Sequence, residues 1–348
     1  MRRVMSILGV CLLGLLAAIF WMAGGDARHG IHAITPRTVG NPPAPEATAT
    51  STLTIVSWNI AWAFGWGSEL KKDAPIKTKA DLDAALDVIG RTLTELRADV
   101  VLLQEVDFGA DRSFGVDQAQ VLAEKTGLSY VAPVISWDLR YLPFPYWPPS
   151  RHAGRMRSGG AILSRFPVSD CTGELLDKPA SQAFWYRAFY LFRYAQRCTV
   201  TVGDRPLLVI NAHLEAFDRA NREIQAEHLA TRLRAAMMPA LIFGGDLNSV
   251  VPEAPVRTGY PDEPETDHRE DRTLTIFRGV EGLTPAFSPE AIRAEPSRYF
   301  TFPSHAPNRG LDHLFVGRGF RVLEARVVSE AGTTSDHLPV LARVTWVP

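Results

Sequence analysis

The chain has 348 residues, of which 46% are hydrophobic, and this is enough apolar material for a large core. Length alone would allow two domains, but single sandwich domains of about 250 residues are ordinary. The formal net charge of −1 argues against a protein that grips duplex nucleic acid by broad charge neutralisation, while leaving room for a local basic patch.

The amino end carries an uncharged apolar stretch, from Val4 to Ala23, directly after Arg2 and Arg3. About 20 residues is the length of a helix that spans a bilayer. Two preceding arginines favour an amino end left in the cytoplasm. We therefore expect residues 1–23 to be a signal-anchor, or a signal peptide that is cleaved. Either would place the body of the chain outside the cytoplasm, membrane-anchored or secreted to the periplasm or medium.

The next segment, residues 24–51, is rich in Pro, Thr, Ala and Gly and has no apolar periodicity, so it is expected to be a flexible linker. Residues 52–348 then form the folded domain. Two of the three cysteines, Cys171 and Cys198, lie in consecutive strand-like segments of this domain. An oxidising compartment favours a disulfide between them, and two buried thiols are the alternative.

Short apolar runs predict many strands in the domain, with few helices between them. The predicted strands are 54–58, 100–103, 161–164, 168–172, 197–202, 207–211, 240–243, 314–316, 322–328 and 340–346. Helical spacing predicts helices over 82–96, 118–126 and 219–238. Because the middle of the chain has consecutive strands without helices, we expect an α/β fold of mixed sheets packed face to face, with helices outside.

Polar residues follow several of these predicted strands. Glu105 comes after a buried run, and a carboxylate at a strand end is a good ligand for Mg²⁺ or Mn²⁺. A lone acid there would more often be a solvated loop residue. Asp246 and Asn248 follow two glycines, which let the backbone turn sharply beside a ligand. An ordinary Asx-type turn is the alternative for this pair.

Two histidines also stand at strand ends. His213 follows the run 207–211, and His337 follows Asp336 near the carboxyl end. Histidines in such places suit acid-base work or charge stabilisation on phosphate, although a single His is more often a satisfied core residue. Asp312 could orient His337, as the acid does in a catalytic triad.

Seven short motifs resemble those of the endonuclease/exonuclease/phosphatase superfamily, which includes deoxyribonuclease I, exonuclease III-type nucleases, neutral sphingomyelinases and inositol polyphosphate 5-phosphatases. The motifs are Trp58-Asn59, Gln104-Glu105, Ser158-Gly159-Gly160, Asn211-Ala212-His213, Gly245-Asp246-Leu247-Asn248, Leu311-Asp312-His313 and Ser335-Asp336-His337. The resemblance covers residues 53–348. It implies a four-layered sandwich of the deoxyribonuclease I type, with two packed mixed β-sheets flanked by helices, and Mg²⁺-dependent phosphoester hydrolysis, with Mn²⁺ as an alternative metal.

The resemblance also implies roles, residue by residue. Glu105 would be the principal metal ligand with Asn59 beside it, and Asp336 would serve the metal directly or through water. The remaining matched residues are catalytic candidates: His213 on the phosphate, Asp246 on the attacking water, Asn248 on phosphate, and His337 as base or electrostatic partner held by Asp312. One departure is His313, which stands where many relatives have tyrosine.

Substrate choice is expected to depend on insertions. Residues 136–150 are aromatic and proline-rich, and basic residues follow. The residues that would touch substrate are Trp137, Tyr146, Arg155 and Arg157. Aromatics with arginines can stack bases and grip phosphates, or dip into a membrane interface. A loop packed on itself is the third reading. The segment 252–273 is acidic and is expected to be a solvated loop.

These observations leave several functions open. The leading prediction is a metal-dependent hydrolase of phosphoesters, chiefly phosphodiesters, by in-line attack of activated water, which includes a nuclease. The alternative is a lipid-headgroup phosphodiesterase of the sphingomyelinase kind or a small-molecule phosphatase. A non-catalytic binding module is least favoured, because the polar site residues are complete. No obligate protein partner is implied.

Overall fold

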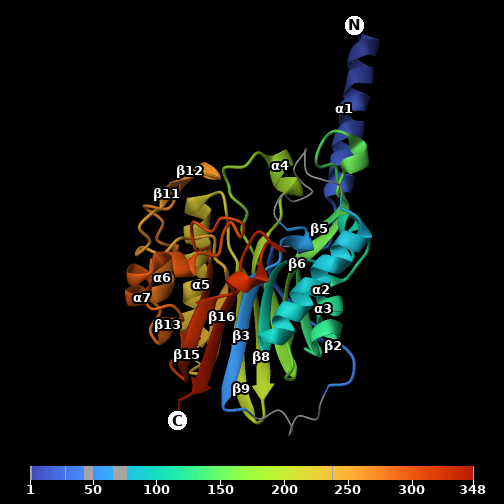
Figure 1. The fold of residues 1–348 in the computed structure, drawn as a ribbon. Helices are drawn as coiled ribbons and strands as arrows, with labels where there is room; N and C mark the ends of the chain where they lie inside the picture. Colours follow the sequence, from blue (N-terminus) through green and yellow to red (C-terminus); the bar gives the residue numbers. More distant parts are fainter. Residues whose placement is uncertain (1, 28, 43–49, 66–76, 237, 348) are drawn as a thin grey trace.

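A computed structural model describes residues 2–27, 29–42, 50–65, 77–236 and 238–347. Two seven-stranded sheets dominate it (Figure 1). The first sheet has the order β1 (Gly30–Ile34), β7 (Val168–Leu176), β8 (Arg193–Val202), β9 (Arg205–His213), β10 (Leu241–Asp246), β14 (Asp312–Gly317) and β13 (Leu283–Pro285). The second has the order β15 (Phe320–Val327), β16 (Val340–Trp346), β3 (Thr52–Asn59), β4 (Val100–Asp107), β6 (Gly154–Ser164), β5 (Tyr130–Leu142) and β2 (Arg37–Thr38).

Both sheets are mixed, because β9–β10 and β3–β4 are parallel pairs among antiparallel ones. Side chains on β4 show how the layers form. Val100 and Leu102 belong to the cluster between the sheets, whereas Val101 and Leu103 belong to the cluster under the helices. This is the period-two alternation of a strand that is buried on both faces.

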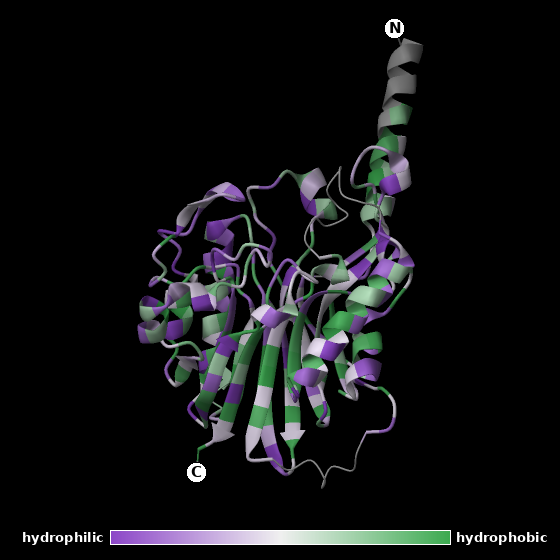
Figure 2. Cartoon of the chain, in the orientation of Figure 1, coloured by the Kyte–Doolittle hydropathy of each residue, from purple (hydrophilic) through white to green (hydrophobic). Residues whose placement is uncertain are grey.

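Helices complete four layers. On the second sheet lie α2 (Lys79–Glu95), which starts with a capping box of Thr78 and Asp81, and α3 (Gln118–Thr126). On the first sheet lie α5 (Arg219–Ala236) and α6 (Thr273–Arg278). Figure 2 shows hydrophobic and hydrophilic residues alternating along α2, as expected of a helix with one buried face. The predicted fold class, two mixed sheets flanked by helices, is confirmed.

The sheet ends nearest α1 (Arg2–Ala23) carry extra elements (Figure 1). They are α4 (Phe184–Phe189) and the two-stranded sheet of β11 (Thr258–Tyr260) and β12 (Glu263–Asp267). The short α7 (Pro289–Ala294) lies beside α6. The sequence analysis predicts no helix over α4, because its six residues are too few to show a helical period.

Three predicted loops are partly ordered. In the segment 24–51, β1 pairs with β7 and β2 pairs with β5, so its described part is not a free linker. In the segment 136–150, the first residues continue β5 as far as Leu142. In the segment 252–273, His268 and Asp271 are buried and Arg222 pairs with Asp271, so it is not simply a solvated loop. Each gains backbone or ionic partners from distant parts of the chain, which local composition does not reveal.

The membrane-spanning expectation for residues 1–23 is not supported. These residues form α1, but within the described part of the chain no helix is long and apolar enough to cross a bilayer. Part of the apolar surface of α1 is used inside the protein, because Ile19 and Met22 line a cavity with α4 and the end of β5.

Cys171 on β7 and Cys198 on β8 form a disulfide. Both side chains lie in the core between the sheets. The disulfide, rather than a pair of buried thiols, is therefore the prediction that the structure confirms.

Candidate active site

A cleft of about 510 Å³ opens where the carboxyl ends of β4, β9 and β10 meet. Six of the residues predicted for the site line it together: Glu105, His213, Asp246, Asn248, Asp336 and His337. They come from both sheets, so the cleft exists only when the sandwich has formed. Two other predicted residues, Asn59 and Asp312, stand behind the cleft wall and contact residues that line it.

Glu105 is directed into the cleft by a β-bulge. The register of β4 against β6 shifts between Gln104 and Val106, so Glu105 has no partner across the ladder. Its φ angle is 54°, a left-handed conformation that non-glycine residues seldom adopt. Bulges of this kind re-aim a side chain, and strain of this kind gathers at functional positions.

Two glycines make close approaches that the site requires. A Cβ on Gly160 would lie 1.9 Å from the Tyr194 hydroxyl, which bridges the sheets by donating to the Leu103 carbonyl at 3.3 Å. Gly245 has a φ of 140°, and a Cβ there would lie 1.8 Å from the Ala212 carbonyl oxygen. The absence of that Cβ lets β10 lie against β9 with Asp246 opposite His213.

The loop that carries Ser335, Asp336 and His337 is fixed by hydrogen bonds to two distant segments. Ser335 Oγ donates to the Asn59 carbonyl at 2.7 Å, and Trp58 Nε1 donates to the His337 carbonyl at 3.0 Å. Ser304 Oγ donates to the Ser335 carbonyl at 2.6 Å. The bonds with Asn59 and Trp58 attach the loop to the end of β3, and the bond with Ser304 attaches it to a second segment. Together they hold His337 in the cleft wall.

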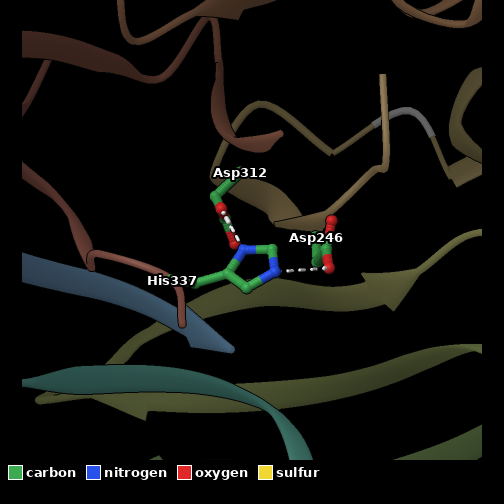
Figure 3. A group of neighbouring side chains, drawn as sticks. All are labelled: Asp246, Asp312 and His337. Atoms are coloured by element: carbon green, nitrogen blue, oxygen red, sulfur yellow. Dashed lines mark hydrogen bonds and ion pairs between the residues drawn. The ribbon is translucent and has the colours of Figure 1, made fainter. Parts of the chain in front are cut away.

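His337 lies between two carboxylates, as Figure 3 shows. Its Nδ1 is 2.8 Å from Asp312 Oδ2, and its Nε2 is 3.8 Å from Asp246 Oδ2. Burial alone would lower the pKa of His337, but the Asp312 and Asp246 carboxylates raise this pKa well above its ordinary value. The ring is therefore protonated at neutral pH, with Nδ1–H donating to Asp312 and Nε2 at ion-pair distance from Asp246.

Three buried carboxylates line the cleft near His337. Burial, together with the nearby charge of Asp336, raises the pKa of Glu105 to about 7. Burial raises the pKa of Asp246 to about 6, although His337 opposes this shift. Burial also raises the pKa of Asp336. Carboxylates held together this closely favour a cation between them.

Asp246 is oriented through both of its oxygens. Asn59 Nδ2 donates to Asp246 Oδ2 at 3.0 Å, and the Asn248 backbone N–H donates to Asp246 Oδ1 at 3.0 Å. The Asn59 oxygen accepts from the Ala61 N–H at 3.0 Å. Asn59 thus orients Asp246 by a hydrogen bond and also lies near Glu105. The bond from the Asn248 N–H to Asp246 forms an Asx-type turn, and the Asn248 residue also lines the cleft.

Arg193 was not predicted from the sequence, yet it lines the cleft and is buried. Its Nη1 lies 2.6 Å from His213 Nε2. Burial and the Arg193 charge lower the pKa of His213 well below its ordinary value, so the ring is neutral and accepts at Nε2. The signal that could have found Arg193 is its cross-strand position: its neighbour Tyr194 pairs with His213.

The predicted substrate contacts divide into two groups. Trp137 lines the cleft, and Tyr146 lines an adjoining cavity. Arg155 and Arg157 are exposed on β6 and line neither the cleft nor that cavity. The alternation of the strand turns them away because their neighbours Met156 and Ser158 occupy the buried face.

Two sets of side chains could hold a metal ion. Among the described residues, Asp246, Asp312 and His337 offer ligand atoms within 4.8 Å of one another. In that set, however, His337 and Asp312 already bond each other. Glu105 and Asp336 offer carboxylate oxygens that are not hydrogen-bonded to a histidine. Hard cations such as Mg²⁺ prefer oxygen ligands.

The sequence pattern of the Endonuclease/Exonuclease/phosphatase family matches residues 56–337, a span that contains every residue of this cleft. The chain belongs to the endonuclease/exonuclease/phosphatase family. No curated protein matches the chain by sequence. The chain is accordingly a hydrolase of a divalent-metal-dependent family whose members act on phosphoesters.

Solved structures agree on the fold of this family member. An endonuclease/exonuclease/phosphatase from Beutenbergia cavernae is 20% identical, with a TM-score of 0.56 over 85% of this chain and 72% of that one. The human nocturnin catalytic domain with bound sulfate is 17% identical, with a TM-score of 0.55 over 90% and 97%. A mannosyl-6-phosphatase from Bacteroides thetaiotaomicron is 14% identical, with a TM-score of 0.54 over 84% and 100%.

Proposed function

We propose that this protein hydrolyses a phosphoester, chiefly a phosphodiester, by in-line attack of a water molecule with Mg²⁺ as its metal and Mn²⁺ as an alternative. The observation that carries the proposal is the convergence of Glu105, Asp336, Asp246 and His337 on one cleft. Each group has its charge or orientation set by a neighbour, which is the arrangement that phosphoryl transfer needs.

Glu105 and Asp336 would hold the cation, which would neutralise charge on the phosphate oxygens. Asp246 is held by Asn59 and Asn248 and takes the proton of the water. The water oxygen forms the new bond to phosphorus as the ester P–O bond breaks. His337, protonated and held by Asp312, donates to a phosphoryl oxygen. Asn248 and the His213–Arg193 pair are placed to contact the remaining oxygens.

The cleft favours a small or amphiphilic phosphoester over a nucleic acid. Its two lining arginines are already paired: Arg193 with His213 and Glu215, and Arg309 with Asp262 and Glu263. A polyanion is normally held by exposed Lys and Arg that neutralise several phosphates. Arg155 and Arg157, the candidates for that task, do not line the cleft.

The test is Mg²⁺-dependent hydrolysis by the full chain of bis(4-nitrophenyl) phosphate, phospholipid vesicles and plasmid DNA. Glu105→Gln and His337→Gln should each reduce turnover by about 10²-fold or more. The matched surface variants Glu95→Gln and His228→Gln should retain it. Turnover that survives both site variants, or that survives chelation of all divalent metal, would overturn the proposal. Preferential cleavage of DNA would instead restore the nuclease alternative.

We also propose that the catalytic body acts outside the cytoplasm. The Cys171–Cys198 disulfide supports this placement, since disulfides persist in oxidising compartments. A reporter enzyme that is active only outside the cytoplasm, fused after the last residue, tests it. An inactive reporter on a fully expressed fusion would contradict this location.

A further inference from the structure

A second cavity, of about 500 Å³, lies beside the catalytic cleft between α4, the end of β5 and the last turn of α1. Trp137, Phe144, Tyr186 and Leu191 line both the cavity and the cleft. The two spaces therefore adjoin at these four side chains, and a chain esterified to a phosphate in the cleft would meet the cavity there.

The cavity wall is apolar, and none of the lining residues that the structure describes is charged. Two of its polar atoms are already engaged elsewhere. Trp137 Nε1 donates to the Phe189 carbonyl at 2.8 Å, and Tyr190 Oη donates to Glu215 Oε1 at 2.7 Å. The cavity thus offers a ligand mainly hydrocarbon and aromatic surface, on which a polar or charged group would lose its hydration.

The aromatic residues of α4 are not buried by the rest of the described chain. Trp185 is 50% exposed and Phe184 is 70% exposed. A six-residue helix that keeps large apolar groups at the surface beside a site is typical of a surface that meets a ligand.

We infer that this cavity is a subsite for an apolar chain esterified to the phosphate of the substrate. The inference rests on the proposed function and deepens it: the substrate class is an amphiphilic phosphoester. The shared wall points to this occupant, because a molecule with a phosphate at one end and hydrocarbon at the other matches the charged cleft and the apolar cavity in turn.

The experiment uses the full chain with Mg²⁺ and 4-nitrophenyl alkyl phosphodiesters from methyl to octyl, each below its micelle concentration. We expect kcat/KM to rise about fourfold per methylene, near the transfer free energy of a buried CH₂, and then to level off. Trp185→Ser should lower the octyl-to-methyl ratio of kcat/KM at least tenfold. The matched control is Trp147→Ser, because Trp147 is 71% exposed nearby and lines neither space.

Binding of ethyl and octyl phosphate, measured by calorimetry with the same variants, separates the two proposals. If no diester is hydrolysed but octyl phosphate binds more tightly through Trp185, the proposed reaction fails and the subsite stands. If turnover proceeds without dependence on chain length, the subsite fails and the reaction stands. Equal losses in Trp185→Ser and Trp147→Ser would indicate adsorption to a general apolar surface, such as a membrane contact, and would overturn the subsite.

Discussion

Gln104 Nε2 donates to Asn211 Oδ1 at 2.7 Å, and this bond joins the end of β4 in one sheet to the end of β9 in the other. Asn211 Nδ2 also donates to the Leu103 carbonyl at 2.9 Å. Both side chains are fully buried and neither lines the cleft. The motifs that contain them therefore align the two halves of the site rather than touch substrate.

Asn211→Ala should consequently act on stability first. It removes these two bonds, while Gln104 Nε2 keeps the Ser57 hydroxyl and the Leu102 carbonyl as acceptors and the Leu103 carbonyl keeps the Tyr194 hydroxyl as a donor. At about 1 kcal/mol for each lost bond, we expect the free energy of unfolding to fall by roughly 1–3 kcal/mol in chemical denaturation. Asn41→Ala, at an exposed position, should change it little. A near-neutral Asn211→Ala would mean that the sheets are aligned by other contacts.

Metal should stabilise the protein more strongly at high pH than at low pH. The folded-state pKa of Glu105 is raised to about 7 and that of Asp246 to about 6, whereas unfolded carboxyls titrate near pH ~4. The folded state holds these protons more tightly. Proton binding by these two carboxyls therefore stabilises the folded state fully below pH ~4, and this stabilisation is lost as the pH rises toward 7. Mg²⁺, by binding the deprotonated site, offsets the loss.

Thermal melts at pH 5 and pH 8 with and without Mg²⁺ check this expectation. The Mg²⁺-induced rise in Tm should be larger at pH 8. In metal-free protein at pH 8, Glu105→Gln should itself raise Tm by roughly 1.5 °C, about the effect of 1 kcal/mol in a chain of this size. The variant should also lose most of the response to Mg²⁺. A response equal to that of Glu95→Gln would show that Glu105 is not a metal ligand.

Arg309 should be essential to the wall of the cleft formed by the β11–β12 hairpin. Its buried guanidinium lies over the rings of Tyr260 and Phe302, 4.4 and 4.6 Å from their centroids. It also pairs with Asp262 at 2.8 Å and with Glu263 at 3.0 Å. Arg309→Met removes charge-assisted hydrogen bonds but leaves carboxylates that are partly exposed, so we expect a loss of about 2–3 kcal/mol of stability.

Chemical denaturation measures that loss. Arg298→Met is the matched control, since Arg298 has an exposed pair with Glu295. Arg309→Lys should recover only part of the stability, because an ammonium cannot bond two carboxylates in a fork or stack flat on two rings. Full recovery by lysine would show that charge alone matters.

The disulfide should contribute measurably to stability. Cys171 and Cys198 are 27 residues apart in sequence, and closing a loop of that length is worth about 3.5 kcal/mol in the chain-entropy account. The double variant Cys171→Ala/Cys198→Ala should lower the free energy of unfolding by roughly that amount. Thiol titration of unfolded, unreduced protein should detect Cys11 alone. Three reactive thiols would mean that the pair is reduced as isolated.

Much of the site could be predicted because strand ends leave a clear local pattern. Glu105, Asp246 and His213 each follow an apolar run, so the sequence predicts that they lie at strand ends, although it does not show that β4 belongs to one sheet and β9 and β10 to the other. Arg193 leaves no such pattern. An arginine at the start of a strand looks solvated in the sequence. Its partner His213 is twenty positions away and comes close only when the two strands pair.

The acidic segment 252–273 was misread for a related reason. Its charges suggest solvent, but Arg309 reaches Asp262 from 47 positions away and Arg222 reaches Asp271 from 49 positions away. Ion pairs between such distant residues depend on the final packing of the sandwich, which the composition of one segment does not contain. The same holds for α4, whose role depends on the cleft beside it.

The short strands β1 and β2 have a practical consequence. They lie at the outer margin of each sheet, β1 against β7 and β2 against β5. A recombinant fragment that starts at residue 52, the boundary suggested by sequence, would leave the main-chain N–H and C=O groups of both β7 and β5 without partners. Bare strand edges are templates for intermolecular pairing. Such a fragment is therefore expected to aggregate, and one that starts before Gly30 is the safer choice for crystallisation and assay.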